Sequence, residues 1–244
     1  RRILGETGSD LSDFLLSLTP GDLDENGLLN PEMKNRTRKA FTAAFGRTVG
    51  RYICEIDGEG EYPVAPFINI RFESVVLPVD NYILTLGAKA GLVNVSDFKT
   101  GDFGLDTVIT TEAGVLELGN SLRFVLAPGE LAPELAMGGY LSAEASANGF
   151  EMDGTTAFGI IDPENLASGG GVKSKNLVLG LVNDEVGYII PANDFYTHRF
   201  LPYVAQENDR LGRGHYEETV SAGPQTAGIL LERWQSIYSQ THAQ

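Results

Sequence analysis

The feature that most constrains the fold is a change in hydrophobic spacing near residue 60. Before it, apolar residues of the segment 33–53 recur every three or four positions, which predicts an amphipathic helix. After it, runs rich in β-branched and aromatic residues predict strands at 65–72, 74–77, 81–86, 105–111, 114–118, 121–127 and 176–182. Helical spacing returns at 131–141 and 226–238. Because strands and helices mix without strict alternation, we predict an α/β or α+β domain on a mixed sheet.

The segment before the long helix carries a candidate calcium loop. A short helical turn at residues 10–20 is expected to lead into a polar loop, and Pro31 is suited to open the next helix. Within the loop, Asp22, Asp24 and Asn26 alternate ahead of Gly27, as oxygen ligands do in calcium loops. An acidic turn that binds no ion is the alternative. We predict one segment at 1–34 and a second at 35–244.

Charge and cysteine content exclude several classes of protein. The formal net charge is −15, and nucleic-acid binding depends on clustered Lys and Arg, which this sequence lacks. No apolar run approaches the roughly 20 residues of a membrane-spanning helix. Cys54 is the only cysteine, so the chain contains no internal disulfide.

Three stretches place polar residues directly after apolar segments, where functional loops are common. In the first, a predicted strand ends in Pro-Gly and presents Glu130, suited to be a metal ligand or general base. In the second, Asn183-Asp184-Glu185 separates a strand from Tyr188. Each stretch also has a purely structural interpretation. Glu130 would then lie in a solvated turn, and Asn183 and Asp184 would form a turn by hydrogen-bonding to their own backbone.

The third stretch contains His215, Tyr216 and Glu217 and leads into the last helix. Its ordinary interpretation is a helix start capped by the hydroxyl of Ser221 or Thr226. His215, taken alone, is expected at the surface. The glycine-rich residues 142–175 are expected to form long loops with little packing of their own.

Together these motifs resemble the C-terminal half of the neutral/alkaline, non-lysosomal ceramidase family. The resemblance rests on the Pro-Gly-Glu that ends at Glu130, the asparagine-containing strand end before Tyr188, and Tyr216-Glu217 ahead of the Gly-Pro-Gln-Thr helix start. A Leu-Pro segment after the predicted strand at 74–77 fits the same order. The resemblance covers about residues 35–240 and implies half of a larger catalytic domain.

The resemblance implies a zinc-dependent amide hydrolase. Glu130 and Tyr188 would bind zinc together with two histidines from the N-terminal half, and Tyr216 would bind the reacting carbonyl oxygen. The histidines of this chain are His198, His215 and His242, and none is paired at ligand spacing. We therefore expect an N-terminal half of the same enzyme, or a second processed chain, to supply the imidazoles.

The same resemblance implies an N-acyl amide or lipid-like substrate such as ceramide, a role in lipid metabolism, and a secreted or cell-envelope location. A second hypothesis is a non-catalytic structural or binding domain of the same fold, with calcium bound near Asp22. The two hypotheses differ in one testable respect: only the enzyme requires Glu130, Tyr188 and Tyr216 to converge on one cavity.

Overall fold

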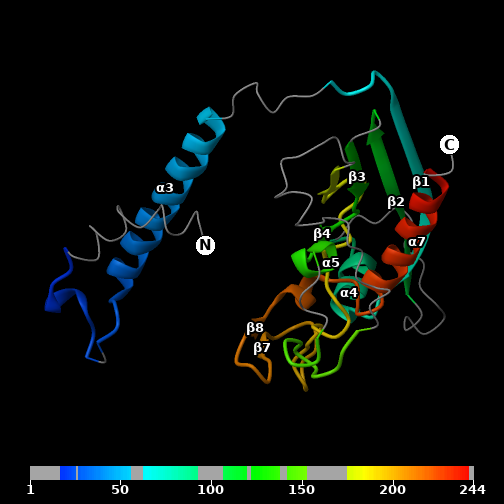
Figure 1. The fold of residues 1–244 in the computed structure, drawn as a ribbon. Helices are drawn as coiled ribbons and strands as arrows, with labels where there is room; N and C mark the ends of the chain where they lie inside the picture. The colour runs from blue at the N-terminus through cyan, green and yellow to red at the C-terminus, as the bar shows by residue number, and fades with distance from the viewer. Residues whose placement is uncertain are drawn as a thin grey trace. The chain divides into compact units, whose positions relative to one another are not determined.

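The computed structural model describes residues 17–25, 27–55, 63–92, 107–119, 122–137, 142–152 and 175–241 (Figure 1). Contacts divide the chain into one unit at Arg1–Tyr62 and a second at Pro63–Gln244. The predicted boundary between residues 34 and 35 falls inside a helix of the first unit. None of the helices in the described ranges combines the length and apolar character needed to span a bilayer.

The first unit contains the 3₁₀ helix η1 (Pro20–Asp22) and the helix α3 (Pro31–Glu55). The predicted helix at 33–53 is confirmed, and it opens at Pro31, where a missing N–H costs nothing. Asn30 caps it, because its side-chain oxygen accepts a hydrogen bond from the backbone N–H of Met33 at 2.9 Å. The first part of the helical turn predicted at 10–20 lies outside the described residues.

The second unit is built on a mixed four-stranded sheet in the order β1-β2-β3-β5. Its strands are β1 (Ile68–Pro78), β2 (Val108–Leu118), β3 (Leu122–Leu126) and β5 (Lys175–Leu179). The first two pairings are antiparallel, and β3 pairs with β5 in parallel. With helices packed on this sheet, the fold is α+β, as predicted. The strands predicted at 65–72 and 74–77 merge into β1, and the described parts of those predicted at 105–111 and 114–118 merge into β2. Residues 105–106 lie outside the described residues.

The strand predicted at 81–86 is wrong, because this segment forms the helix α4 (Tyr82–Lys89). Its β-branched and aromatic residues favour a strand, but Asn81 decides the outcome as an N-cap. The Asn81 side-chain oxygen accepts hydrogen bonds from the backbone N–H groups of Ile83 and Leu84 at 3.1 and 3.2 Å. Its amide group donates to the carbonyl oxygen of Ser221 at 2.9 Å, which holds the helix start in place.

The helix α7 (Thr226–Thr241) covers one face of the sheet and packs against β1 and β2 (Figure 1). Trp234 of this helix is fully buried, and its indole N–H donates to the carbonyl oxygen of Leu126 at 3.2 Å. The predicted hydroxyl cap is wrong, since neither Ser221 nor Thr226 has a hydrogen-bond partner for its buried side-chain oxygen. The core contains buried residues from the sheet, this helix and the loops around it: Val75, Leu77, Ala113, Val115, Val125, Leu135, Ile189, Leu230, Leu231, Trp234 and Ile237.

Short elements beyond the sheet carry the predicted site residues. They are β4 (Glu130–Leu131), α5 (Pro133–Met137), β6 (Tyr188–Ile189), β7 (Glu207–Asn208), β8 (Gly214–His215) and the 3₁₀ helix η4 (Glu217–Val220). The helix predicted at 131–141 corresponds to α5, which begins at Pro133 because Glu130 and Leu131 form β4; residues 138–141 lie outside the described ranges.

The predicted long loop at 142–175 is only partly described, and its residues 153–174 lie outside the description. The described part, 142–152, is held more firmly than predicted. The Arg210 guanidinium donates to the carbonyl oxygens of Glu144 and Ser146 at 3.0 and 3.2 Å. The Asn148 amide donates to the carbonyl oxygen of Phe195 at 2.7 Å. These bonds attach residues 142–152 to the segments that follow β6.

Candidate active site

The predicted metal ligands Glu130 and Tyr188 lie side by side. Glu130 follows the end of β3 by a short Ala-Pro-Gly turn, and Tyr188 follows β5 by a longer loop. The two residues are direct partners in the parallel pairing of β4 with β6. A turn after each of two parallel strands therefore delivers a carboxylate and a phenol to the same edge of the sheet.

Two glycines allow the segments of the site to touch backbone to backbone. Gly129 lies against the carbonyl oxygen of Gly187, and Gly187 lies against the carbonyl oxygen of Val220, at the end of the 3₁₀ helix that follows Tyr216. A Cβ atom at either glycine would overlap the oxygen it faces. Gly187 also has a φ of 85°, in the left-handed region that favours glycine. Each predicted ligand thus directly follows a glycine that brings its strand into contact with the next segment.

Tyr216 lies between β8 and η4 and joins the other two residues. Its ring meets the Tyr188 ring edge to face, with centroids 5.9 Å apart and an interplanar angle of 82°. A hydrogen bond with Tyr216, partial burial and the negative charge of Glu130 raise the pKa of Tyr188 to about 12. The phenol of Tyr188 therefore keeps its proton at neutral pH unless a cation takes the proton's place.

These three residues line one cavity of about 300 Å³. We call Glu130, Tyr188 and Tyr216 the ligand wall of this cavity. Glu130 and Tyr216 are exposed, and Tyr188 is half-buried. Within the described ranges no Lys, Arg or His forms an ion pair with Glu130, although Arg213 and His215 line the same cavity.

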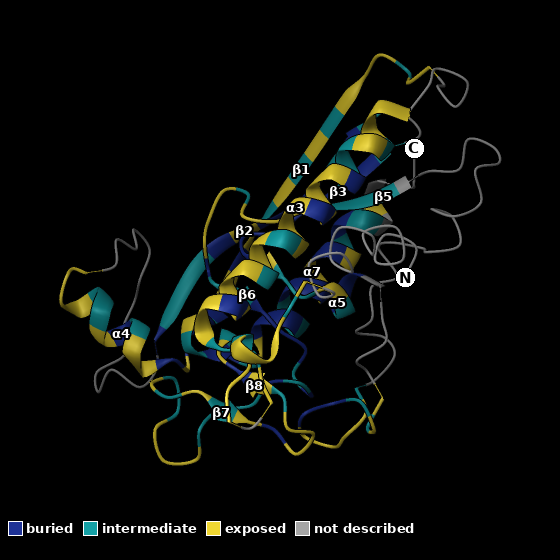
Figure 2. Ribbon diagram, turned by 90° about the vertical axis from the view of Figure 1, so that its left-hand side faces the viewer, coloured by how far each residue is buried: buried dark blue, intermediate teal, exposed yellow. Residues whose placement is uncertain are grey.

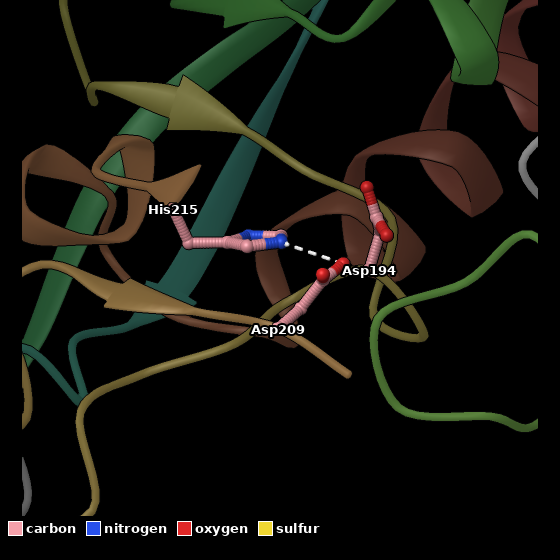
Figure 3. A group of neighbouring side chains, drawn as sticks. All are labelled: Asp194, Asp209 and His215. Carbon is pink, nitrogen blue, oxygen red and sulfur yellow. Dashed lines mark hydrogen bonds and ion pairs between the residues drawn. The ribbon is translucent and has the colours of Figure 1, made fainter. Parts of the chain in front are cut away.

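The same cavity is also lined by charged residues that the sequence analysis did not assign to a site. We call Asp194, Arg213, His215 and Glu218, with Asp209 behind them, the ion-pair wall. The Arg213 guanidinium donates to Asp194 Oδ1 at 2.7 Å and to Asp209 Oδ2 at 2.6 Å. His215 places Nδ1 2.8 Å from Glu218 Oε1 and Nε2 3.3 Å from Asp209 Oδ2, and Figure 3 shows the ring aimed at Asp209.

The expectation that His215 lies at the surface is wrong, because its side chain is only 8% exposed. Burial alone would favour the neutral ring, but the hydrogen bond with Glu218 and the charges around it raise the pKa of His215. Burial would likewise raise the pKa of Asp209, yet hydrogen bonds from Arg213 and His215 hold it well below its usual range. These contacts therefore favour the charged forms of His215 and Asp209, which lie with the Arg213 guanidinium beside the carboxylates of Asp194 and Glu218.

Asp194, Asp209 and His215 are also close enough to hold a metal ion, with one ligand atom from each within 4.8 Å of the others. Arg213, however, already donates to both of these aspartates, and the guanidinium occupies the position that a cation would need. A metal here would have to displace a charged side chain from two ion pairs. The geometry favours an internal ion-pair network that fixes the loop before Tyr216.

Each described histidine already forms hydrogen bonds or ion-pair contacts with other groups of the chain. His198 Nδ1 accepts hydrogen bonds from the backbone N–H groups of Phe200 and Leu201, and its Nε2 lies 3.7 Å from Glu207. Both nitrogens of His215 face carboxylates, and His242 lies outside the described residues. The described part of the chain thus provides the ligand wall with oxygen atoms and with no uncommitted imidazole.

Asn183 and Asp184 do not form the self-contained turn that was the alternative for this stretch, although Glu185 accepts a local hydrogen bond from the backbone N–H of Gly187. The Asn183 amide donates to Glu112 at 3.1 Å, and the Thr111 hydroxyl donates to Asp184 at 2.6 Å. Both contacts reach β2 rather than the local backbone. They tie the loop between β5 and β6 to the sheet, and so help to fix the position of Tyr188.

The candidate calcium residues belong to the first unit of the chain. The Asp22 carboxylate accepts hydrogen bonds from the backbone N–H and the hydroxyl of Thr19, at 2.7 and 2.8 Å, which lowers the pKa of Asp22. Asp24 accepts from the backbone N–H of Leu28 at 2.9 Å. Asn26 lies outside the described residues. The described oxygen atoms stabilise the turn itself, and calcium binding there stays a prediction.

The chain was compared with models of protein families, with curated proteins and with solved structures, and no match was found in any of the three comparisons.

Proposed function

We propose that Glu130, Tyr188 and Tyr216 belong to the active site of a zinc-dependent amide hydrolase similar to the neutral ceramidases. One observation carries the proposal: three side chains from distant segments of the sequence line one cavity, and two of them are paired in register. A non-catalytic domain would not require this convergence.

The chemistry of the ligand wall fits zinc in part. Zinc accepts carboxylate oxygens readily, and the charge of Glu130 has no cationic partner in the described ranges. Tyr188 lies next to it, with a proton that a cation would replace. Catalytic zinc sites have three protein ligands or more, so the remaining ligands come from residues beyond the described ones. The proposal assigns them to imidazoles of another polypeptide segment.

When bound, zinc would supply an activated water and polarise the amide carbonyl. In the reaction the amide C–N bond breaks, the water oxygen joins the acyl carbon, and the nitrogen leaves with a proton as an amine. Tyr216 is exposed and lines the cavity, and in this proposal its hydroxyl donates to the carbonyl oxygen as negative charge develops. Such a contact is worth about 3 kcal/mol in the transition state. The substrate class is N-acyl amides, with lipid-like amides such as ceramide as the first choice.

The test is hydrolysis of an N-acyl amide by the complete protein as its source organism makes it. Tyr216→Phe should lower kcat by about 10² to 10³ with little change in KM, because the lost contact forms only in the transition state. Tyr82→Phe is the matched control, since it removes an exposed phenol that does not line the cavity. Equal kcat values for the two variants would remove Tyr216 from the mechanism.

A further inference from the structure

Glu218 is a buried acid in a part of the chain that is mostly exposed or half-buried. Its exposed fraction is 2%, whereas few residues from 196 to 217 are buried, as Figure 2 shows for the chain around β7 and β8. The buried exceptions in that range are Asp209 and His215. Burying a carboxylate is costly unless it is paired and hydrogen-bonded. The partners of Glu218 therefore indicate its role.

These partners belong to the two segments that carry the phenols of the ligand wall. Glu218 Oε1 accepts a hydrogen bond from the backbone N–H of Tyr196 at 2.9 Å and lies 2.8 Å from His215 Nδ1. Tyr196 lies in the segment that follows β6, which begins at Tyr188, and His215 directly precedes Tyr216. One carboxylate oxygen thus joins the segment of Tyr188 to that of Tyr216. Hydrogen bonds to a charged acceptor are about twice as strong as neutral ones.

The segment of Tyr188 is also attached to η4 on the other side of this tyrosine. Gly187 lies against the carbonyl oxygen of Val220, the last residue of η4, and forms a β-bridge with Ser221. Glu218 belongs to the same short helix. Two attachments to η4, one before Tyr188 and one after it, therefore fix where the phenol of Tyr188 lies relative to this helix.

Tyr216 lies at the start of η4, and its own backbone bonds are local. Its N–H donates to Glu217 Oε2 at 3.0 Å, and its carbonyl oxygen accepts from the backbone N–H and the hydroxyl of Thr219 at 3.0 and 2.6 Å. Bonds within three residues shape this turn, but they do not place it against another segment. The contact between Tyr216 and Tyr188 therefore depends on how η4 is attached, and Glu218 supplies the charged attachment.

We propose that Glu218 is a positioning residue, which holds the rings of Tyr216 and Tyr188 edge to face by joining their segments through one buried charge. The contact that it maintains has ring centroids 5.9 Å apart and includes a hydrogen bond between the two side chains. The importance of this contact for amide hydrolysis rests on the proposed function, whereas the contact itself does not.

NMR of the chain with isotope-labelled tyrosine rings tests this positioning without any reaction. The two rings are assigned by the signals that disappear in Tyr188→Phe and in Tyr216→Phe. In the wild type we expect cross-relaxation between them, because the edge of one ring faces the other. In Glu218→Gln this cross-relaxation should be at least threefold weaker. The amide is neutral and holds the two donors less firmly, and its NH2 group takes the place of Oε2, which is buried without a hydrogen-bond partner in the described ranges.

Two further variants control the NMR experiment. Glu207→Gln is the matched control, because Glu207 also faces a histidine, His198, but at 3.7 Å, partly exposed and outside the cavity lining. Its cross-relaxation should equal that of the wild type. Glu218→Asp keeps the charge on a shorter side chain and should weaken the signal as well, so the test does not depend on the folding of one variant. Cross-relaxation as strong as in the wild type in both variants of Glu218 would overturn the proposal.

The kinetics of N-acyl amide hydrolysis by the complete protein test whether Glu218 acts through Tyr216. Glu218→Gln should lower kcat at least tenfold with little change in KM. In a protein that already carries Tyr216→Phe, the same substitution should change kcat by no more than about twofold, because the hydroxyl that Glu218 positions is then absent. Equal losses of kcat in the two backgrounds would show that Glu218 acts on the fold in general, and would overturn the proposal.

The two measurements separate this proposal from the proposed function. Cross-relaxation that depends on Glu218, in a protein that hydrolyses no N-acyl amide, would remove the proposed function while the positioning stands. Amide hydrolysis with an unchanged kcat in Glu218→Gln would remove the positioning while the proposed function stands.

Discussion

On the ion-pair wall of the cavity every carboxylate is bonded to Arg213 or His215, whereas on the ligand wall Glu130 has no charged partner in the described ranges. Both walls are polar, and both contribute to the same cavity. The difference is whether the charges compensate one another within the chain. Removing one partner of a buried ion pair destabilises a fold, because the remaining charge loses its compensation, while an exposed carboxylate without an ion pair is available to a ligand. We therefore expect substitutions on the two walls to affect different properties.

The largest effect should come from the backbone contact that holds the walls together. Gly187→Ala places a methyl group against the carbonyl oxygen of Val220 and forces alanine into a left-handed conformation. We expect a loss of at least about 3 kcal/mol in the free energy of unfolding, measured by urea denaturation. Gly212→Ala is the matched control, because Gly212 has a φ of 77° and open space around its missing Cβ. Its cost should be about 1 kcal/mol, and equal losses would show that strain alone is responsible.

On the ion-pair wall, Asp209→Asn should cost about 3 kcal/mol of unfolding free energy. The substitution keeps the shape of the side chain but leaves Arg213 and His215 without the charge they share. Glu207→Gln is the control, since the contact of Glu207 with His198 is longer, at 3.7 Å, and partly exposed. A loss below about 0.5 kcal/mol in both variants would mean that the network does not stabilise the fold.

The pH dependence of the unfolding free energy should reveal the contribution of the charged form of His215. Its partners Glu218, Asp209 and Asp194 raise the folded-state pKa of His215 above the unfolded value of about 6.5. Its contribution is therefore fully present below about pH 6.5 and is lost as the pH rises through the folded pKa. In urea denaturation from pH 5.5 to 9, the wild-type chain should lose stability relative to His215→Gln as the pH rises. If the unfolding free energies of the wild-type chain and of His215→Gln changed in parallel with pH, the result would contradict an imidazolium at this position.

The smallest effect on stability should come from the ligand wall. Glu130→Gln and Tyr188→Phe remove polar atoms from an exposed and a half-buried side chain, and each should change the unfolding free energy by about 0.5 kcal/mol or less. Thermal denaturation of the metal-free chain measures this directly. A loss of unfolding free energy similar to that of Asp209→Asn would show that the ligand wall stabilises the fold as much as the ion-pair wall does.

The sequence predicts the parts of this site that depend on local pattern. The apolar run that ends in Pro-Gly marks Glu130 as a candidate ligand or base, because strands end where polar residues begin, whereas Tyr188 is selected through the resemblance to the ceramidases. The ion-pair wall has no such signal, since Asp194, Asp209 and His215 meet only when three loops fold together. The helix at 82–89 was missed for a related reason: the choice between strand and helix there depends on the side-chain cap at Asn81, and Asn81 itself is held by the distant Ser221.

Zinc binding by the complete protein tests the central claim that the ligand wall holds a metal. Affinity can be measured by competition with a zinc chelator in the wild type, in Glu130→Gln and Tyr188→Phe, and in Glu134→Gln, which alters another acid of the same cavity. The account predicts one zinc per molecule, affinity reduced at least tenfold by each of the first two substitutions, and no change in Glu134→Gln. Equal affinity in all four proteins would show that the metal, if one binds, is held elsewhere.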